Sequence, residues 1–117
     1  MGQGGSVAGK IARGDIRLFR FPKPDKQRPV LVLTRDSIID SLSRVTIAPL
    51  TSTIRGVASE VMLGPDDGMK DACAINLHNI VTVPKAGLGR LVVSLDSRRL
   101  EQVCAAIAFA LGCGRNG

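Results

Sequence analysis

Short apolar segments recur along most of this chain, and turn residues rather than helices separate them. One of them, Val30-Leu31-Val32-Leu33-Thr34, is almost continuously apolar and β-branched, so we expect protein to cover this strand on both faces. Pro49 is expected to end the third strand, and residues 36–44 to form a helical turn or a loop. Short strands without interleaved helices favour a small barrel or a strongly bent sheet over βαβ units. The predicted strands cover residues 16–21, 30–34, 45–49, 57–63, 74–77, 80–83 and 88–95.

One helix is expected near the C-terminus, because Asp96 can cap its first turn and Gly112 can end it. Both of its faces carry apolar residues, which a small domain cannot bury alone. We therefore expect a subunit or a partner protein to cover the second face; the alternative is a tightly wrapped helix with one exposed phenylalanine. The stripe predicted to face the core is Leu100, Val103, Cys104, Ile107 and Leu111. The opposite side carries Ala105, Ala106, Phe109 and Ala110.

Length and charge limit the classes of function. The chain has 117 residues, of which 44% are hydrophobic, and this suits one domain over residues 13–113 with a flexible tail at 1–12 and a short one at 114–117. Residues 1–35 hold eight basic and two acidic side chains, which account for the whole net charge of +6. This excess predicts a patch that attracts RNA, DNA or an acidic protein segment, or else a solubilising N-terminus. Aromatic residues make up only 3%, which disfavours a module built on base stacking.

The sequence offers little for metal or cofactor chemistry. Its three cysteines lack CxxC spacing and it has one histidine, so we expect no structural zinc site, no catalytic metal and no cofactor. Asp66, Asp67 and Asp71 are interpreted as a solvated turn, with a divalent-ion site as the alternative. Three thiols and no apolar leader indicate a reducing, cytoplasmic setting in which Cys104 behaves as a small apolar residue.

Polar residues stand at the ends of two neighbouring strands. Arg28 precedes one apolar run and Thr51 follows another, and a guanidinium with a hydroxyl can grip one phosphate. The pair suggests phosphodiester chemistry; the alternative is a surface strand residue and an ordinary turn. Asn76, His78 and Asn79 form a polar cluster that either closes a turn or reads unstacked bases.

Four motifs in register resemble the MazF/PemK toxins of bacterial toxin–antitoxin systems, over residues 14–112. They are Gly14-Asp15-Ile16, Arg28-Pro29-Val30-Leu31-Val32-Leu33, Pro49-Leu50-Thr51-Ser52-Thr53 and Asn79-Ile80-Val81-Thr82-Val83. The resemblance implies a mainly β (α+β) fold: a small SH3-like β-barrel of the MazF/CcdB type with a C-terminal α-helix. It also implies a cytoplasmic homodimer that cuts single-stranded RNA as an mRNA interferase, inhibits translation and is silenced by an acidic antitoxin.

Carried over by position, the resemblance makes Arg28 the catalytic arginine and Thr51 the catalytic threonine. The cut would be metal-independent, with the RNA's own 2′-hydroxyl as nucleophile and a 2′,3′-cyclic phosphate and a 5′-hydroxyl as products. The general base stays open, because a guanidinium is a poor proton acceptor. The residues expected to bind RNA are Lys23, Lys26, Ser52, Thr53, Arg55, Asn76, His78 and Asn79.

This chain departs from the family in the loop before Arg28, where only residues 22–27 intervene and a glutamate common among members has no counterpart. That departure bears on substrate sequence more than on fold or reaction. Two rival functions remain: a gyrase-poisoning toxin of the same fold, and a noncatalytic nucleic-acid-binding module.

Overall fold

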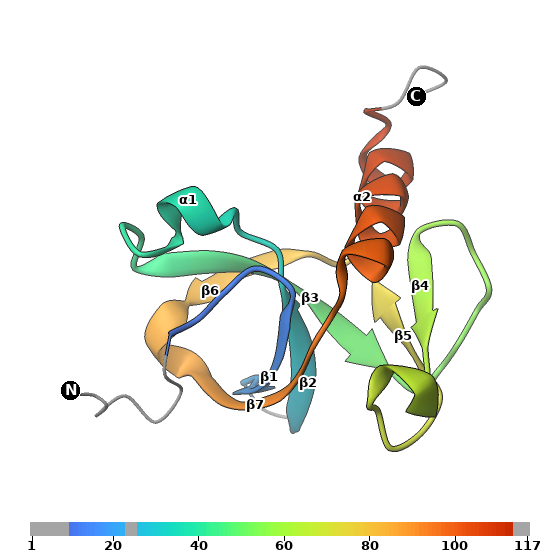
Figure 1. Cartoon of the computed structure of the whole chain (residues 1–117), viewed down its shortest axis with the longest axis horizontal. Coiled ribbons are helices and arrows are strands. Elements are labelled where there is room, and N and C mark those ends of the chain that lie inside the picture. The colour runs from blue at the N-terminus through green and yellow to red at the C-terminus, as the bar shows by residue number, and fades with distance from the viewer. Residues whose placement is uncertain (1–9, 23–25, 114–117) are drawn as a thin grey trace.

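The computed structural model describes residues 10–22 and 26–113, and most of both predicted tails lies outside this part. Strands dominate the described chain, with one long helix at its end (Figure 1). The strands are β1 (Asp15–Arg20), β2 (Gln27–Val32), β3 (Arg44–Thr51), β4 (Glu60–Leu63), β5 (Cys73–Asn76), β6 (Val81–Pro84) and β7 (Leu88–Ser94). The helices are α1 (Asp36–Ile39), α2 (Ser97–Leu111) and the 3-10 turns η1 (Pro65–Asp67) and η2 (Lys85–Gly87).

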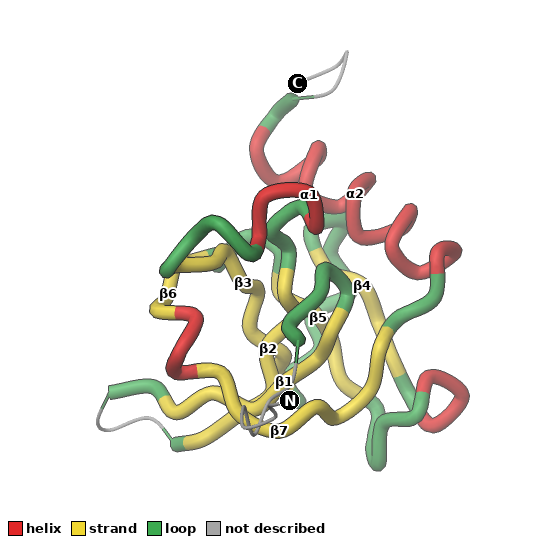
Figure 2. The backbone as a smooth tube through the Cα atoms, turned by 60° about the vertical axis from the view of Figure 1, so that its left-hand side comes forward, coloured by secondary structure: helices red, strands yellow, loops and turns green. Residues whose placement is uncertain are grey.

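The strands form one antiparallel sheet in the order β4-β5-β3-β2-β1-β7, and β6 also pairs with β3. The sheet is strongly bent, so that β7 curls round below β1 and β2 while α2 stands above β4 and β5 (Figures 1 and 2). This confirms a mainly β antiparallel fold with a C-terminal helix. Among the described residues no pairing joins β4 to β7, the two ends of this strand order.

Two buried clusters lie on opposite sides of β2. Leu31 belongs to the cluster that packs under α2 with Val103, whereas Val30 and Val32 belong to a second cluster with Ile39 of α1. All three residues of β2 are fully buried, as expected for a strand covered on both faces. β2 is therefore a rigid support for the residues at its start.

Most strand boundaries differ from the prediction by a residue or more, and the largest differences lie in β2, β3 and β4. β2 begins at Gln27, so Arg28 lies within the strand, and β4 begins only at Glu60 rather than at residue 57. The prediction that Pro49 ends β3 is wrong, because β3 continues to Thr51. On one edge β3 leaves β6 at Ile47 and meets β5 at Leu50, so the missing N–H of Pro49 falls where that edge needs no ladder bond.

The ends of α2 are as predicted but its buried stripe is rotated. The Asp96 carboxylate accepts a 2.9 Å hydrogen bond from the backbone N–H of Arg99, and Gly112 ends the helix with φ 68°. Cys104 and Leu111 are exposed, so their placement in the core was wrong, and Ala106 from the supposed outer face is buried. The contact of α2 with β4 decides which face of the helix is buried, and the spacing of apolar residues alone does not determine that face.

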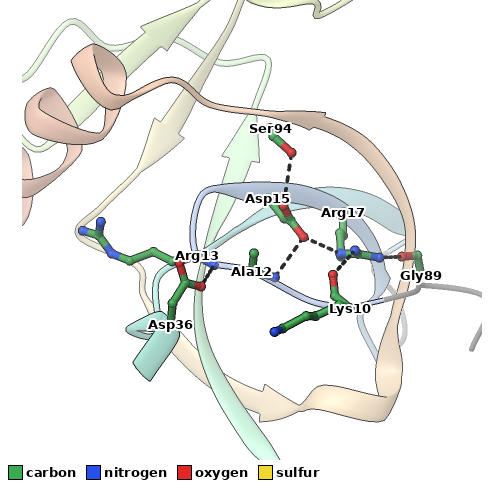
Figure 3. A network of polar contacts seen from close by, with 8 residues as sticks. All are labelled: Lys10, Ala12, Arg13, Asp15, Arg17, Asp36, Gly89 and Ser94. Carbon is green, nitrogen blue, oxygen red and sulfur yellow. Dashed lines mark hydrogen bonds and ion pairs between the residues drawn. The ribbon is translucent and has the colours of Figure 1, made fainter. Parts of the chain in front are cut away.

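A buried ion pair fastens the chain before β1 to the sheet (Figure 3). Arg17 donates from Nε to Asp15 at 3.0 Å, and its other nitrogens donate to the carbonyl groups of Gly89 and Lys10. Asp15 also accepts from the backbone N–H of Ala12 at 3.0 Å. Because Arg17 is only 2% exposed, it is a structural residue and not part of a surface basic patch.

Candidate functional site

The register of the sheet brings Arg28 and Thr51 together. β2 pairs with β3 so that Val30 faces Pro49, and continuing this ladder by two residues sets Arg28 opposite Thr51. Residues that face each other across an antiparallel pair lie on the same face of the sheet. Arg28 and Thr51 therefore project from rigid, adjacent strands toward the same side.

Two pockets meet at this pair, because Arg28, Thr51 and Thr53 line both of them. The larger has a volume of about 680 Å³ and the smaller about 270 Å³. The larger pocket is lined by Lys26, Gln27, Arg28, Pro29, Leu50, Thr51, Ser52, Thr53, Met69, Lys70, Asp71, Ala72 and Cys73. The smaller is lined by Arg28, Pro49, Thr51, Thr53, Arg55, Glu60, Asn76 and Asn79.

Local contacts orient both side chains of the pair. The Arg28 guanidinium lies 5.9 Å from the centre of the Phe21 ring, which in turn meets Phe19 edge to face. The Thr51 hydroxyl oxygen accepts a 3.1 Å hydrogen bond from the backbone N–H of Thr53, which leaves its proton to donate elsewhere. The pair can thus offer a cationic fork and a hydroxyl donor to one anionic group between the two pockets.

The comparisons with known proteins settle the family. A family model described as PemK-like, MazF-like toxin of type II toxin-antitoxin system matches residues 12–111. The chain belongs to the MazF/PemK family of type II toxin endoribonucleases. Among its relatives in Mycobacterium tuberculosis, the probable endoribonuclease MazF2 is 36% identical over 104 residues, which are 88% of this chain and 100% of the relative. The probable endoribonuclease MazF5 is 41% identical over 105 residues, or 89% of this chain and 95% of that one.

Solved structures of MazF proteins share this fold. The Mycobacterium tuberculosis toxin MazF-mt6 matches with a TM-score of 0.77 at 34% identity, over 84% of this chain and 96% of that one. An endoribonuclease from a mycobacterial species, solved with its cognate antitoxin, matches with a TM-score of 0.79 over 90% and 98% of the two chains. At 24% identity the second likeness shows the fold alone.

Most of the MazF-type site residues predicted from the sequence line the two pockets. Lys26 and Ser52 line the larger pocket, and Arg55, Asn76 and Asn79 line the smaller one, while Thr53 lines both. Lys23 lies outside the described residues.

His78 lines neither of these pockets. Its Nδ1 is hydrogen-bonded to the Ser59 hydroxyl, and its backbone N–H donates to Asn76 Oδ1 at 3.2 Å. These contacts match the turn-closing alternative for this part of the cluster, and they leave the amide nitrogen of Asn76 and the second lone pair of its oxygen for other hydrogen bonds.

The sequence reasoning missed Glu60, the only acidic residue that lines the smaller pocket within the described chain. Its Oε1 accepts hydrogen bonds from the backbone N–H groups of Arg55 at 3.1 Å and Gly56 at 3.0 Å. Its Oε2 is buried and has no hydrogen-bond partner among the described residues. The available signal was an acidic residue inside an apolar strand, where a surface position was the simpler reading.

The larger pocket is lined by one thiol, that of Cys73, and Asp67 near this thiol forms an ion pair with Arg99. Burial, with Asp67 and Asp71 nearby, raises the pKa of the Cys73 thiol, so Cys73 is a poor nucleophile at neutral pH. The hydrogen-bonded Arg99 guanidinium lowers the pKa of Asp67, whose carboxylate receives 2.9 and 3.0 Å bonds from it. This pair ties η1 to α2, and Asp67 is thus a structural anion.

No helix within the described ranges is long and apolar enough to cross a membrane.

Proposed function

We propose that this chain is a sequence-specific, metal-independent endoribonuclease that cuts single-stranded RNA, acting in the cytoplasm as an mRNA interferase that inhibits translation. The observation that carries the proposal is the shared placement of Arg28 and Thr51: they line both pockets, and the register of β2 and β3, extended from Val30 and Pro49, sets them opposite each other. A scissile phosphate held there would have one flanking nucleotide on the side of each pocket. Single-stranded substrate is required, because bases must be splayed from their stack to enter pockets.

In this mechanism the 2′-hydroxyl of the RNA attacks the adjacent phosphorus, and the bond from phosphorus to O5′ breaks. The products are a 2′,3′-cyclic phosphate and a 5′-hydroxyl. Arg28 stabilises the crowded, negatively charged phosphorane through paired hydrogen bonds, and Thr51 donates another and helps to set the in-line geometry. Neither role uses a metal ion.

We assign RNA contacts according to the two pockets. Lys26, Ser52 and Thr53 would hold one flanking nucleotide, and Arg55, Asn76 and Asn79 the other. Lys23 is proposed as a further RNA contact, and His78 as a contact beyond the pockets. Basic groups supply affinity without sequence choice, whereas the amide side chains can read base edges.

We further propose a homodimer and an acidic antitoxin as partners. The apolar end of α2 is uncovered, with Phe109 63% and Leu111 56% exposed. A groove of about 530 Å³ lies between α2 and residues 56–62. A second copy of the chain would cover this surface, and an acidic segment of the antitoxin would compete with RNA for the basic pockets. The bent sheet is proposed to close into the SH3-like barrel.

The test is cleavage of a long single-stranded RNA by the purified protein in EDTA, with the ends mapped and their chemistry determined. We expect cuts at a short recurring sequence with 5′-hydroxyl ends. Arg28→Ala and Thr51→Ala should each lower the rate by about a hundredfold or more while the fold is kept. Intact RNA would refute the ribonuclease. A gyrase poison would instead trap DNA cleavage complexes, and a noncatalytic module would shift RNA in a gel without cutting it.

A further inference from the structure

Two hydrogen bonds hold the Glu60 carboxylate in one orientation, and only one of its two oxygens takes part in them. The two backbone N–H groups of Arg55 and Gly56 both donate to Oε1, so the carboxylate cannot rotate without losing them. Oε2 is buried with no donor in the described chain. An unpaired buried oxygen is costly, and a catalytic role is one of the reasons, beside strain or a bound water or ion, for which native proteins keep such a group.

The sheet register sets this carboxylate on the same face as Thr51. Thr51 pairs with Ala74 of β5, Asn76 follows two residues later on the same face, and Asn76 pairs with Glu60 of β4. Arg28, opposite Thr51, lines the same smaller pocket. A proton acceptor therefore lies on the side of the phosphate site that the smaller pocket occupies.

We propose that Glu60 is the general base of the RNA cleavage, an inference that rests on the ribonuclease function proposed above. Oε2 takes the proton of the 2′-hydroxyl as O2′ forms its bond to phosphorus and the bond from phosphorus to O5′ breaks. The departing O5′ takes a proton from a solvent water, and the hydroxide left behind receives the proton held by Glu60. The carboxylate is restored and no net proton is gained or lost.

The other groups near the pair are less suited to take this proton. Arg28 carries only donors. His78 lines neither pocket and has its Nδ1 bonded to Ser59, while Asp71 is exposed at the larger pocket. Oε2 is almost fully buried in the free protein, so the proposal requires the structure around Glu60, such as the irregular segment 52–59 that binds Oε1, to shift when RNA binds. Catalytic contacts commonly tighten only in the substrate complex.

The test compares wild type, Glu60→Gln and Glu60→Asp on an RNA with one mapped cleavage site, with protein in excess. Glutamine keeps an oxygen that can accept from the two backbone N–H groups but cannot take a proton, so we expect a fall of about 10²–10⁴-fold in the rate. Aspartate should give an intermediate rate. Affinity for the same RNA carrying a 2′-O-methyl group at the cleaved nucleotide should be unchanged. Glu101→Gln, at an exposed position of α2, is the matched control and should cleave normally.

The pH profile separates a base from a merely structural residue. The charged groups facing Glu60 are Arg28 and Arg55 in the pocket and Arg99 across the groove, and arginines stay charged throughout the assay. The acidic limb of the rate profile should therefore vanish in Glu60→Gln and persist in His78→Asn.

Three results would overturn the inference: a full rate in Glu60→Gln, an unchanged acidic limb, or a loss of affinity for the methylated RNA as large as the loss of rate. If Glu60→Gln cut at the full rate but at a different sequence, Glu60 would recognise a nucleobase of the RNA and would not be the general base. If wild type itself leaves RNA intact, the proposed function fails; if wild type cuts and Glu60→Gln cuts equally, only this inference fails.

Discussion

The buried pair of Asp15 and Arg17 gives the sharpest stability prediction. Methionine in place of Arg17 keeps an unbranched, apolar stem but removes the guanidinium that donates to Asp15, Gly89 and Lys10. Asp15, only 5% exposed, would keep its bonds from Ala12 and Ser94 but lose its countercharge. Breaking a buried pair from one side costs about 3–5 kcal/mol.

That loss is a large part of the 5–15 kcal/mol by which such domains are stable. For a chain of this size each kcal/mol lowers the midpoint by roughly 4 °C, so Arg17→Met should melt about 12–20 °C below wild type. Urea unfolding followed by circular dichroism measures the free energy directly. Arg20→Met is the matched control, because Arg20 is exposed at the end of the same strand and should cost less than about 0.5 kcal/mol.

The double variant Asp15→Asn/Arg17→Met completes a double-mutant cycle for this ion pair. Removing both charges leaves a neutral amide that can still accept from the Ala12 N–H, so it should be more stable than Arg17→Met alone. A loss below about 1 kcal/mol in Arg17→Met, or a double variant less stable than the single, would refute the uncompensated-charge argument.

Three further outcomes follow from the described contacts. Because the folded-state pKa of Asp67 lies below its unfolded value, the stability it contributes is present above about pH 4 and lost as pH falls through the folded value. The difference in unfolding free energy between wild type and Asp67→Asn should therefore shrink on acidification, and a constant difference would contradict the Arg99 pair. Peptide mapping after brief alkylation should find Cys104 modified well before Cys73, whose thiol is half-buried with a raised pKa; equal rates would contradict the rotation of α2. Phe109→Ser should weaken self-association in light scattering without lowering the melting midpoint of the monomer, and a wild-type monomer at micromolar concentration would remove the argument for a dimer.

Features encoded by short-range chemistry could be predicted from the sequence. The Asp96 cap and the Gly112 end of α2 each depend on one residue's local conformation, and both were correct. The errors arose where distant contacts decide. Pro49 stays within β3 because the neighbouring strand changes from β6 to β5 there. Ala106 replaces Cys104 in the buried stripe because α2 turns its face toward β4.

The candidate site divides in the same way. Arg28 and Thr51 were predicted from their places at two strand ends and from motifs that resemble those of the family, and the register accounts for both lining the same pockets. Glu60 carries no such motif, and its relation to Thr51 passes through three strands and two pairings. Its unpaired oxygen becomes visible only when the hydrogen bonds of the segment at Arg55 are known.

The basic N-terminal third illustrates how a fold redistributes charge. Arg17 is buried against Asp15, and Lys10 lies 3.6 Å from Asp40 on the surface. Arg13 donates from its guanidinium to Cys104 Sγ at 3.1 Å. These three cations serve contacts within the protein. The net charge of the segment therefore overstates what it can offer to RNA.

The salt dependence of RNA binding measures how many cations of the protein contact RNA phosphates. The cations lining the two pockets in the described chain are Lys26, Arg28, Arg55 and Lys70. If each neutralises one phosphate of a single strand, the logarithm of the affinity should fall against the logarithm of salt with a slope of about −3. Engagement of all eight basic residues of the first 35 would give about −6 instead. The measurement uses a short 2′-O-methyl RNA. If its slope is near −6 and stays so when Arg55 and Lys70 are replaced by glutamine, the N-terminal surface rather than the pockets holds the strand.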